Sequence, residues 1–207
     1  DVYACRQTGF AMLAETNPQE VMDLSPVAHL AAIEGKVPFI NFFDGFRTSH
    51  EIQKIEKWDY ADLKEMCNMD AVKAFREHAL NPEHPAMRGS HENGDVFFQH
   101  REACNSVYEA LPAVVKKYMG KINEKLGTNY DLFNYYGAED ADRVIIAMGS
   151  ICDVAEEVID YLTAKGEKVG LVKVRLYRPW VSEAFLKVLP KTVKKVAVLD
   201  RTKEPGA

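Results

Sequence analysis

An alternation of apolar runs and amphipathic stretches between Arg143 and Leu199 constrains this chain more than any other feature. The apolar runs have the length of strands, and the stretches between them have the spacing of helices. We predict strands at 144–148, 168–175 and 193–199, and helices at 153–165 and 182–189. Gly149 and Gly166 stand at two of the joins. Since short loops between alternating strands and helices build a parallel sheet with right-handed crossovers, the region is predicted to be a βαβαβ unit.

A second helix and strand are predicted nearer the start of the chain. Asn17 and Pro18 are typical of an N-cap and a first helical position, and this helix is expected to kink or split at Pro26 and to end at Gly35. The apolar run 37–43 predicts a buried parallel strand that is covered on both faces. Elsewhere we expect a strand at 2–5, helices at 58–80 and 106–126, and an irregular connector at about 81–101.

Polar side chains crowd the loop that follows this apolar run. Asp44, Arg47, Thr48 and His50 are candidate site residues, because ligands of open α/β sheets gather beyond the carboxyl ends of the strands. An arginine can clamp a carboxylate with two hydrogen bonds, and a histidine can transfer protons near neutral pH. In the structural alternative, Asp44 makes the turn, Thr48 caps a helix together with Glu51, and Arg47 pairs with an acidic neighbour. The residues themselves leave both interpretations open.

Two further groups invite a functional interpretation. The helix start at Gly149-Ser150 could hold a phosphate or carboxylate, but capping by Ser150 and Asp153 is the favoured interpretation. A local group of basic residues is interpreted as a solvated face or a domain contact. It comprises Lys173, Arg175, Arg178 and Arg201.

Composition excludes several classes of function. A formal net charge of −5 argues against a nucleic-acid partner, which needs a basic face. No apolar stretch approaches the roughly 20 residues of a membrane helix, so we expect no membrane partner. The 4 cysteines include no CxxC pair, and we expect reduced thiols in a cytoplasmic protein and no metal or iron–sulfur site in this segment. The histidines between positions 78 and 100 share no helical spacing that would suggest a metal site.

Several strings of the sequence resemble the pyruvate:ferredoxin (or flavodoxin) oxidoreductase family. They are DVYACRQTGFAM at 1–12, VPFINFFDGFRTSHE at 37–51, NPEHP at 81–85, VKVRLYRP at 172–179 and LDRTKEPGA at 199–207. The resemblance covers the whole chain and implies an internal segment of a much longer polypeptide, as do the start at Asp1 and the Pro-Gly-Ala ending. It implies an α/β fold with parallel sheets flanked by helices. Residues 1–130 would be the later half of a thiamine-enzyme pyrimidine-binding domain, and 131–207 a domain like the C-terminal domain of transketolase.

The activity that the resemblance implies is the oxidative decarboxylation of pyruvate to acetyl-CoA and CO₂. Thiamine diphosphate with Mg²⁺ performs the decarboxylation, [4Fe–4S] clusters carry single electrons to ferredoxin or flavodoxin, and coenzyme A takes the acetyl group. The family's enzymes are expected to be homo-oligomers. Two alternatives are an oxidoreductase for another 2-oxoacid and a free-standing, non-catalytic binding or assembly module.

The family's catalytic residues fall outside these positions. Its activating glutamate and its pyruvate-binding threonine and arginine precede Asp1, and its magnesium motif and cluster cysteines follow Ala207. We therefore expect no catalytic, cofactor-binding or metal-binding residue in this segment, which would be scaffold and interface and inactive in isolation. Asp44, Arg47, Thr48 and His50 would then lie at a site edge or an interface.

Overall fold

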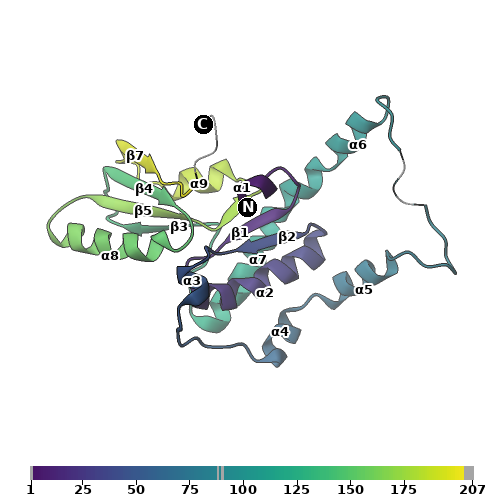
Figure 1. Cartoon of the computed structure of the whole chain (residues 1–207), viewed down its shortest axis with the longest axis horizontal. Coiled ribbons are helices and arrows are strands. Elements are labelled where there is room, and N and C mark those ends of the chain that lie inside the picture. Colours follow the sequence, from purple (N-terminus) through teal and green to yellow (C-terminus); the bar gives the residue numbers. More distant parts are fainter. Residues whose placement is uncertain (1, 88, 90, 203–207) are drawn as a thin grey trace.

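Two small sheets adjoin in the middle of the molecule, and helices cover them (Figure 1). The computed structural model describes residues 2–87, 89 and 91–202. The strands are β1 (Ala11–Ala14), β2 (Phe39–Phe42), β3 (Phe133–Gly137), β4 (Arg143–Ala147), β5 (Val169–Val174), β6 (Leu176–Arg178) and β7 (Lys195–Val198). The helices are α1 (Val2–Cys5), α2 (Pro18–Gly35), α3 (Arg47–His50), α4 (Tyr60–Met66), α5 (Met69–Glu77), α6 (Phe97–Ala103), α7 (Asn105–Leu126), α8 (Ile151–Ala164) and α9 (Ser182–Val188).

The first sheet has the order β2-β1-β6 and carries α2 and α7 on one face. β1 and β2 are parallel, with Leu13 opposite Asn41, whereas β6 is antiparallel to β1. Ala11 and Leu13 pack into the same core as Leu24 of α2 and Val115 of α7. Most of the buried side chains here are apolar, and their burial is the main source of stability.

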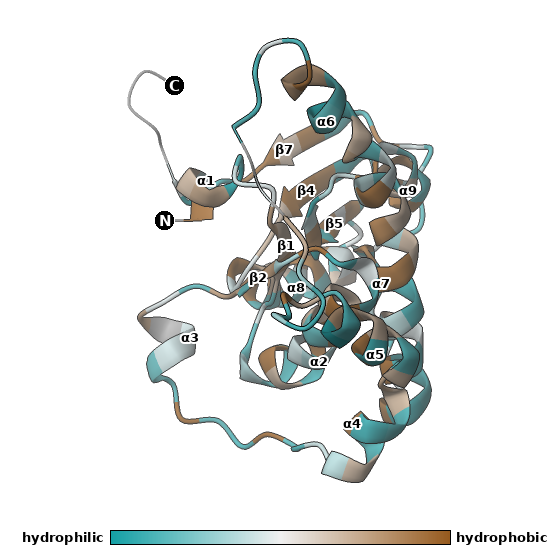
Figure 2. Cartoon of the chain, turned by 90° about the vertical axis from the view of Figure 1, so that its right-hand side faces the viewer, coloured by the Kyte–Doolittle hydropathy of each residue, from teal (hydrophilic) through white to brown (hydrophobic). Residues whose placement is uncertain are grey.

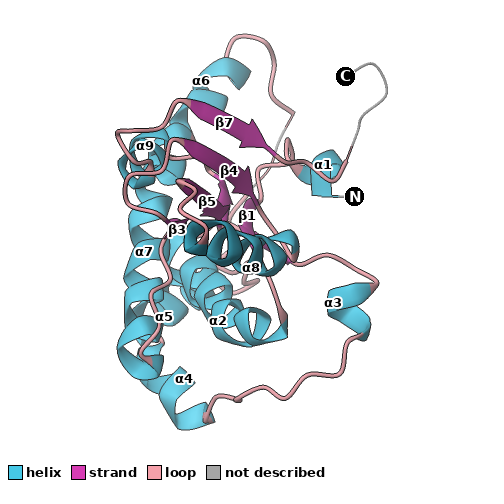
Figure 3. Ribbon diagram, turned by 90° about the vertical axis from the view of Figure 1, so that its left-hand side faces the viewer, coloured by secondary structure: helices cyan, strands magenta, loops and turns pink. Residues whose placement is uncertain are grey.

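The second sheet has the order β3-β5-β4-β7 and realises the predicted βαβαβ unit. β4 pairs in parallel with β5 and with β7, while β3 is antiparallel to β5. α8 packs on one face through Cys152, Ala155 and Ile159 (Figure 3). α9 packs on the other face, where the rings of Phe133 and Phe185 meet edge to face at 5.6 Å. β4 and β5 are correspondingly apolar (Figure 2).

The helix α2 begins and ends where the sequence predicts. Asn17 Oδ1 accepts a hydrogen bond from the Glu20 amide at 3.0 Å, and Lys36 ends the helix in the left-handed conformation. The helix does not split at Pro26. A proline has no N–H, so it leaves the Met22 carbonyl without its usual helical donor. Trp58 Nε1 donates to that oxygen at 3.1 Å, and the helix continues.

The first half of the chain departs from the prediction in four places. Residues 2–5 are helical and do not form a strand. The fully apolar run 11–14 forms the buried strand instead. β2 is half-buried at the sheet edge and not covered on both faces, since the described residues place no strand beyond it. The stretch 58–80 forms two helices, because Asn68 caps a new helix that begins at Met69. The Asn68 side chain accepts a hydrogen bond from the Ala71 amide. Within the connector 81–101, the described residues before α6 form no helix or strand, and the connector includes the first residues of α6.

The described residues between α5 and α6, together with α6, extend away from the body (Figure 1), whereas α4 packs against the body through Met66, which is 3% exposed. At the end of α7, Lys125 Nζ also pairs with Asp62 and Glu65 of α4 at 2.9 Å each. Among the described residues, no helix is both long and apolar enough to cross a membrane.

Candidate functional site

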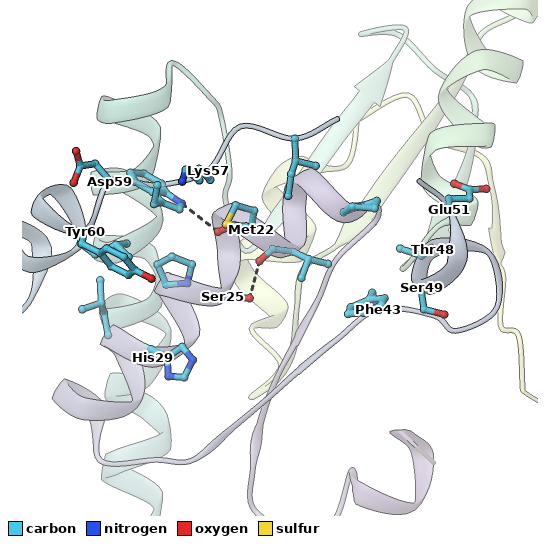
Figure 4. A pocket seen from close by; sticks show the side chains of 17 residues that line it. Met22, Ser25, His29, Phe43, Thr48, Ser49, Glu51, Lys57, Asp59 and Tyr60 are labelled. Atoms are coloured by element: carbon cyan, nitrogen blue, oxygen red, sulfur yellow. Dashed lines mark hydrogen bonds between the residues drawn. The ribbon is translucent and has the colours of Figure 1, made fainter. Parts of the chain in front are cut away.

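A groove of about 1340 Å³ lies between α2 and the extended segment 51–59 that joins α3 to α4 (Figure 4). Thr48, Ser49 and Glu51 lie at one end of the groove, Asp59 and Tyr60 at the other, and α2 runs between them. Its remaining lining is largely apolar and includes Val21, Met22, Pro26, Leu30, Phe43, Ile55, Trp58 and Leu63. Such a lining favours contact with apolar groups over charged ones.

The four candidate residues of the loop do not converge on this groove. Thr48 is buried at its edge, and its hydroxyl lies 3.5 Å from Asp44 Oδ1. His50 is exposed, with Nδ1 at 2.8 Å from Ser49 Oγ. Arg47 begins α3, and its side chain lies outside the described part of the structure. Since α3 begins before Thr48, the predicted capping pair of Thr48 with Glu51 does not form at the helix start.

Asp44 turns toward the start of α8, which joins two features that the sequence presents separately. Its Oδ1 accepts the Ser150 amide at 2.9 Å, and its Oδ2 accepts the Ser150 hydroxyl at 2.5 Å. Arg201 Nη1 also donates to Oδ2, at 2.8 Å. Burial opposes the ionised form, but the Ser150 hydrogen bonds and the Arg201 charge outweigh it and lower the pKa of Asp44.

The helix start at Gly149-Ser150 thus binds a carboxylate from the chain itself. The predicted cap is wrong in its partners, because Ser150 makes no side-chain cap and Asp153 turns away to accept Asn17 Nδ2 at 3.1 Å. A carboxylate at this position complements the helix dipole and satisfies an amide that the helix leaves open. Asp44 therefore has the capping role that the sequence assigns to Ser150 and Asp153.

A second contact lies deeper, between α2 and the residue that separates β5 from β6. Arg175 Nη1 and Nη2 donate to the two carboxylate oxygens of Glu20 at 2.6 and 2.8 Å. Arg175 Nε also donates to Asn134 at 2.6 Å. Burial disfavours the charge on Glu20, but the hydrogen bonds and charge of Arg175 lower its pKa. The backbone takes part as well, since the Ala14 amide donates to the Arg175 carbonyl at 2.8 Å.

The basic group of the sequence is therefore dispersed over separate contacts. Arg175 is buried in its pair with Glu20, Lys173 Nζ lies 2.5 Å from Glu156, and Arg178 lies over the Tyr177 ring at 4.2 Å. Arg201 extends to Asp44. The interpretation as a contact between parts of the fold is confirmed for Arg175 and Arg201. No local signal could have predicted the Glu20 pair, because its members are 155 positions apart.

The described residues contain no group of three His, Cys, Asp or Glu side chains that could hold a metal ion. The four cysteines are unpaired and lie in separate parts of the chain, and burial raises the pKa of the Cys152 thiol to about 12. A thiol with so high a pKa is neither a ready nucleophile nor a ready ligand. The contacts that these polar groups make are with one another: Asp44 with Ser150 and Arg201, and Glu20 with Arg175.

Comparison with known proteins gives the fold and then the family. A solved structure of a 2-oxoglutarate:ferredoxin oxidoreductase from Magnetococcus marinus aligns with a TM-score of 0.53 at 19% identity. The alignment covers 91% of this chain and 34% of that one, and at this identity it shows the fold alone. This class of fold agrees with the predicted α/β architecture.

Sequence comparison is more specific. The family described as pyruvate flavodoxin/ferredoxin oxidoreductase, thiamine diphosphate-binding, matches residues 1–120, and the pyruvate:ferredoxin oxidoreductase core domain II matches 141–207. A pyruvate-flavodoxin oxidoreductase of Enterobacter agglomerans is 60% identical over all 207 residues, and a pyruvate:ferredoxin oxidoreductase of Moorella thermoacetica is 58% identical. The chain belongs to the pyruvate flavodoxin/ferredoxin oxidoreductase family. It spans 18% of the length of each of these two relatives.

Proposed function

We propose that these residues are part of an enzyme that oxidises pyruvate, with coenzyme A, to acetyl-CoA and CO₂ and reduces ferredoxin or flavodoxin. The observation that carries the proposal is the identity of 58–60% with two such oxidoreductases along the entire chain. The two matched family regions succeed each other along the chain without overlap, which supports the same assignment. A cytoplasmic location and a homo-oligomeric parent belong to the same proposal.

Within that enzyme we infer that this segment is scaffold and interface. Asp44 has its carboxylate engaged by Ser150 and Arg201, and Thr48 is buried beside it. Groups held in this way are unsuited to bind a substrate without first breaking internal contacts. A division near residue 130 is part of the proposal, supported by the second sheet, whose strands all lie after that point; β6 of the first sheet crosses the division.

The donor set of the segment does not fit the inorganic cofactors of the proposed enzyme. Magnesium needs several oxygen ligands in one place, and a [4Fe–4S] cluster needs four thiolates. The described residues gather neither, and the buried Cys152 thiol has a raised pKa. Thiamine diphosphate supplies carbanion chemistry where it is bound. We assign its site, with those of magnesium and the clusters, to the rest of the enzyme.

A calorimetric titration of this 207-residue chain with thiamine diphosphate and Mg²⁺ tests the assignment. We expect no micromolar binding. A micromolar dissociation constant would show that the segment holds the cofactor and would overturn the scaffold role, while leaving the family assignment intact.

The enzyme that contains the segment tests the activity and the role of the loop. We expect pyruvate to be preferred over 2-oxoglutarate and branched-chain 2-oxoacids in an assay with coenzyme A and ferredoxin or flavodoxin. Replacing His50 by Ala should leave kcat close to its original value, because the scaffold role gives His50 no proton to transfer. A general acid or base would lose about 100-fold or more. A preference for another 2-oxoacid would contradict the substrate assignment.

A further inference from the structure

Glu15 is a buried carboxyl group at the join of β1 and β2. It directly follows β1, and the residue is 1% exposed. Its backbone amide donates to the Phe42 carbonyl at 3.0 Å, which continues the pairing of β1 with β2. Within the described part of the chain, neither carboxyl oxygen of Glu15 has a hydrogen-bond partner. A buried carboxylate in this condition is costly, and such groups usually bind a proton instead.

A third unpaired acceptor, Asn41 Oδ1, belongs to the neighbouring strand. Asn41 lies opposite Leu13, and side chains alternate along a strand, so Asn41 shares a sheet face with Leu13 and Glu15. That face carries α2. Asn41 Nδ2 donates to Ser25 Oγ at 2.9 Å, and Ser25 Oγ donates to the Val21 carbonyl at 2.6 Å (Figure 4 shows the second bond).

Burial and the charge of Glu20 favour the neutral form of Glu15, and the charge of Arg175 opposes it. Arg175, on the link between β5 and β6, already gives both terminal nitrogens to Glu20 and its Nε to Asn134. Glu20 of α2 brings a negative charge that repels an ionised Glu15. Burial has the largest effect and raises the pKa of Glu15 to about 8, although Asn41 of β2 and the charge of Arg175 favour ionisation.

We propose that Glu15 is a neutral carboxylic acid in the folded chain and that its O–H donates to Asn41 Oδ1, which makes the join between β1, β2 and α2 dependent on pH. One proton then satisfies two of the three unpaired atoms and completes a hydrogen-bonded series Glu15–Asn41–Ser25–Val21. The third atom becomes a neutral carbonyl oxygen, which is far cheaper to bury than a charge.

The series affects more than its own strands because Asp44 lies only three positions after Asn41. The Asp44 carboxylate binds the start of α8. When Glu15 ionises, the O–H that donates to Asn41 Oδ1 is lost, and the end of β2 keeps its backbone pairing with β1 but loses this side-chain bond. The strand end from which the loop 44–50 starts is then held less firmly. The fold thus contains a proton-dependent tie at the base of the loop that carries the candidate residues.

The sign of the pH effect is set by the direction of the shift. The pKa of Glu15 is higher in the folded chain, about 8, than the ordinary value of 4.5. Its contribution to stability is therefore complete below the ordinary value and is lost as the pH rises through the folded value. Folding takes up a proton in the interval between the two.

The variant Glu15→Gln removes the titration and keeps a donor, since the glutamine amide can donate to Asn41 Oδ1. The unfolding constant of the original chain, divided by that of E15Q, should rise about tenfold per pH unit between about pH 5 and 8 and level off above. Urea denaturation at a series of pH values measures both constants. Glu157→Gln, an exposed position on α8, is the matched control and should leave the profile unchanged. A ratio that is independent of pH overturns the proposal.

Infrared spectroscopy tests the same point without unfolding and does not depend on the variant being stable. The folded chain at pH 6 should show the carbonyl stretch of a protonated carboxylic acid, and this band should disappear with a midpoint near pH 8. The band should be absent from E15Q and present in E157Q. Hydrogen exchange should become faster in residues 41–50 of the original chain than in E15Q above that midpoint. A folded chain without the band at pH 6 means that Glu15 is ionised, and the proposal is then wrong.

Discussion

Two carboxylates join the elements of the first sheet to those of the second, and they do so in opposite surroundings. The Glu20–Arg175 pair is buried on both sides, with side chains 8% and 5% exposed. Asp44 is 16% exposed and binds the Arg201 side chain, which is 69% exposed, together with Ser150. Desolvation makes the inner pair costly to break singly, whereas solvent and salt weaken the outer one. The buried pair is therefore expected to contribute most to the stability of the junction, and the contribution of the exposed contact is expected to vary with salt.

Arg175→Met should have the largest effect on stability. It removes the charge that compensates Glu20 and leaves a buried carboxylate unpaired, so we expect a loss of about 3–5 kcal/mol in the free energy of unfolding. Urea denaturation at pH 7 measures it. Arg143→Met, which breaks an exposed pair with Glu167, is the control and should change little. A loss of stability no larger than that of the control would mean that the Glu20–Arg175 pair does not stabilise the fold.

The inner pair also predicts acid sensitivity. The pKa of Glu20 is lowered in the folded chain, so its stabilising contribution is present above its ordinary pKa of 4.5 and is lost as the pH falls through the folded value. Stability measured between pH 5 and pH 2 should therefore fall less steeply in Glu20→Gln than in the original chain. An identical slope in both would contradict the lowered pKa.

Asp44→Ala should rank second. It deprives the Ser150 amide and hydroxyl of their acceptor at the start of α8, and hydrogen bonds to a charged group contribute about 1.5–3 kcal/mol. Differential scanning calorimetry should show a lower Tm, with a smaller reduction for Asp44→Asn, which keeps one acceptor oxygen. Equal effects of both variants would mean that the charge, and not the cap on α8, is what matters.

Trp58→Phe should cost about 1 kcal/mol, because it leaves the Met22 carbonyl of α2 without a donor. The double variant with Pro26→Ala provides the control, since alanine restores the backbone N–H that position 26 lacks. If that N–H replaces the indole donor, the loss due to Trp58→Phe should shrink in the alanine background. A loss that is the same in both backgrounds would assign the effect of Trp58 to packing in the groove.

Arg201→Ala should have the smallest effect. The exposed side chain contributes about 0–1 kcal/mol, and its contribution should vanish at 1 M salt because the charges are screened. Thermal denaturation at low and high salt measures the difference. A loss that persists at 1 M salt would mean that the Arg201–Asp44 contact is shielded from salt, as the Glu20–Arg175 pair is.

The sequence predicts the helices and strands of this fold where the periodic pattern of apolar residues is long enough to indicate which side chains are buried. The βαβαβ unit and the helix after Asn17 are predicted from periodicity and capping and are confirmed. The strands β3 and β6 escape prediction: β6 has only three residues, and β3, with the sequence FNYYG, lacks the apolar run of β4 and β5. The run 37–43 is typical of a fully buried strand, yet β2 lies at the edge, since an apolar pattern does not say how many strands lie beyond it.

Polar partners are harder to predict than elements. Periodicity shows which face of α2 is buried but not that Arg175 lies opposite Glu20. The sequence indicates both the loop at Asp44 and the helix start at Ser150 as candidates, but it does not show that one binds the other. The placement of Asp44, Arg47, Thr48 and His50 at a site edge or interface of the whole enzyme stays a prediction.

Hydrogen exchange of Arg175→Met, compared with the original chain, tests most directly the claim that buried polar contacts join the two sheets. Since Glu20 and Arg175 tie α2 to the link between β5 and β6, amides of β1 and of β5 should lose protection together and by similar factors. Loss of protection confined to one sheet, with the other unchanged, would show that the two sheets are stable independently and would contradict the account.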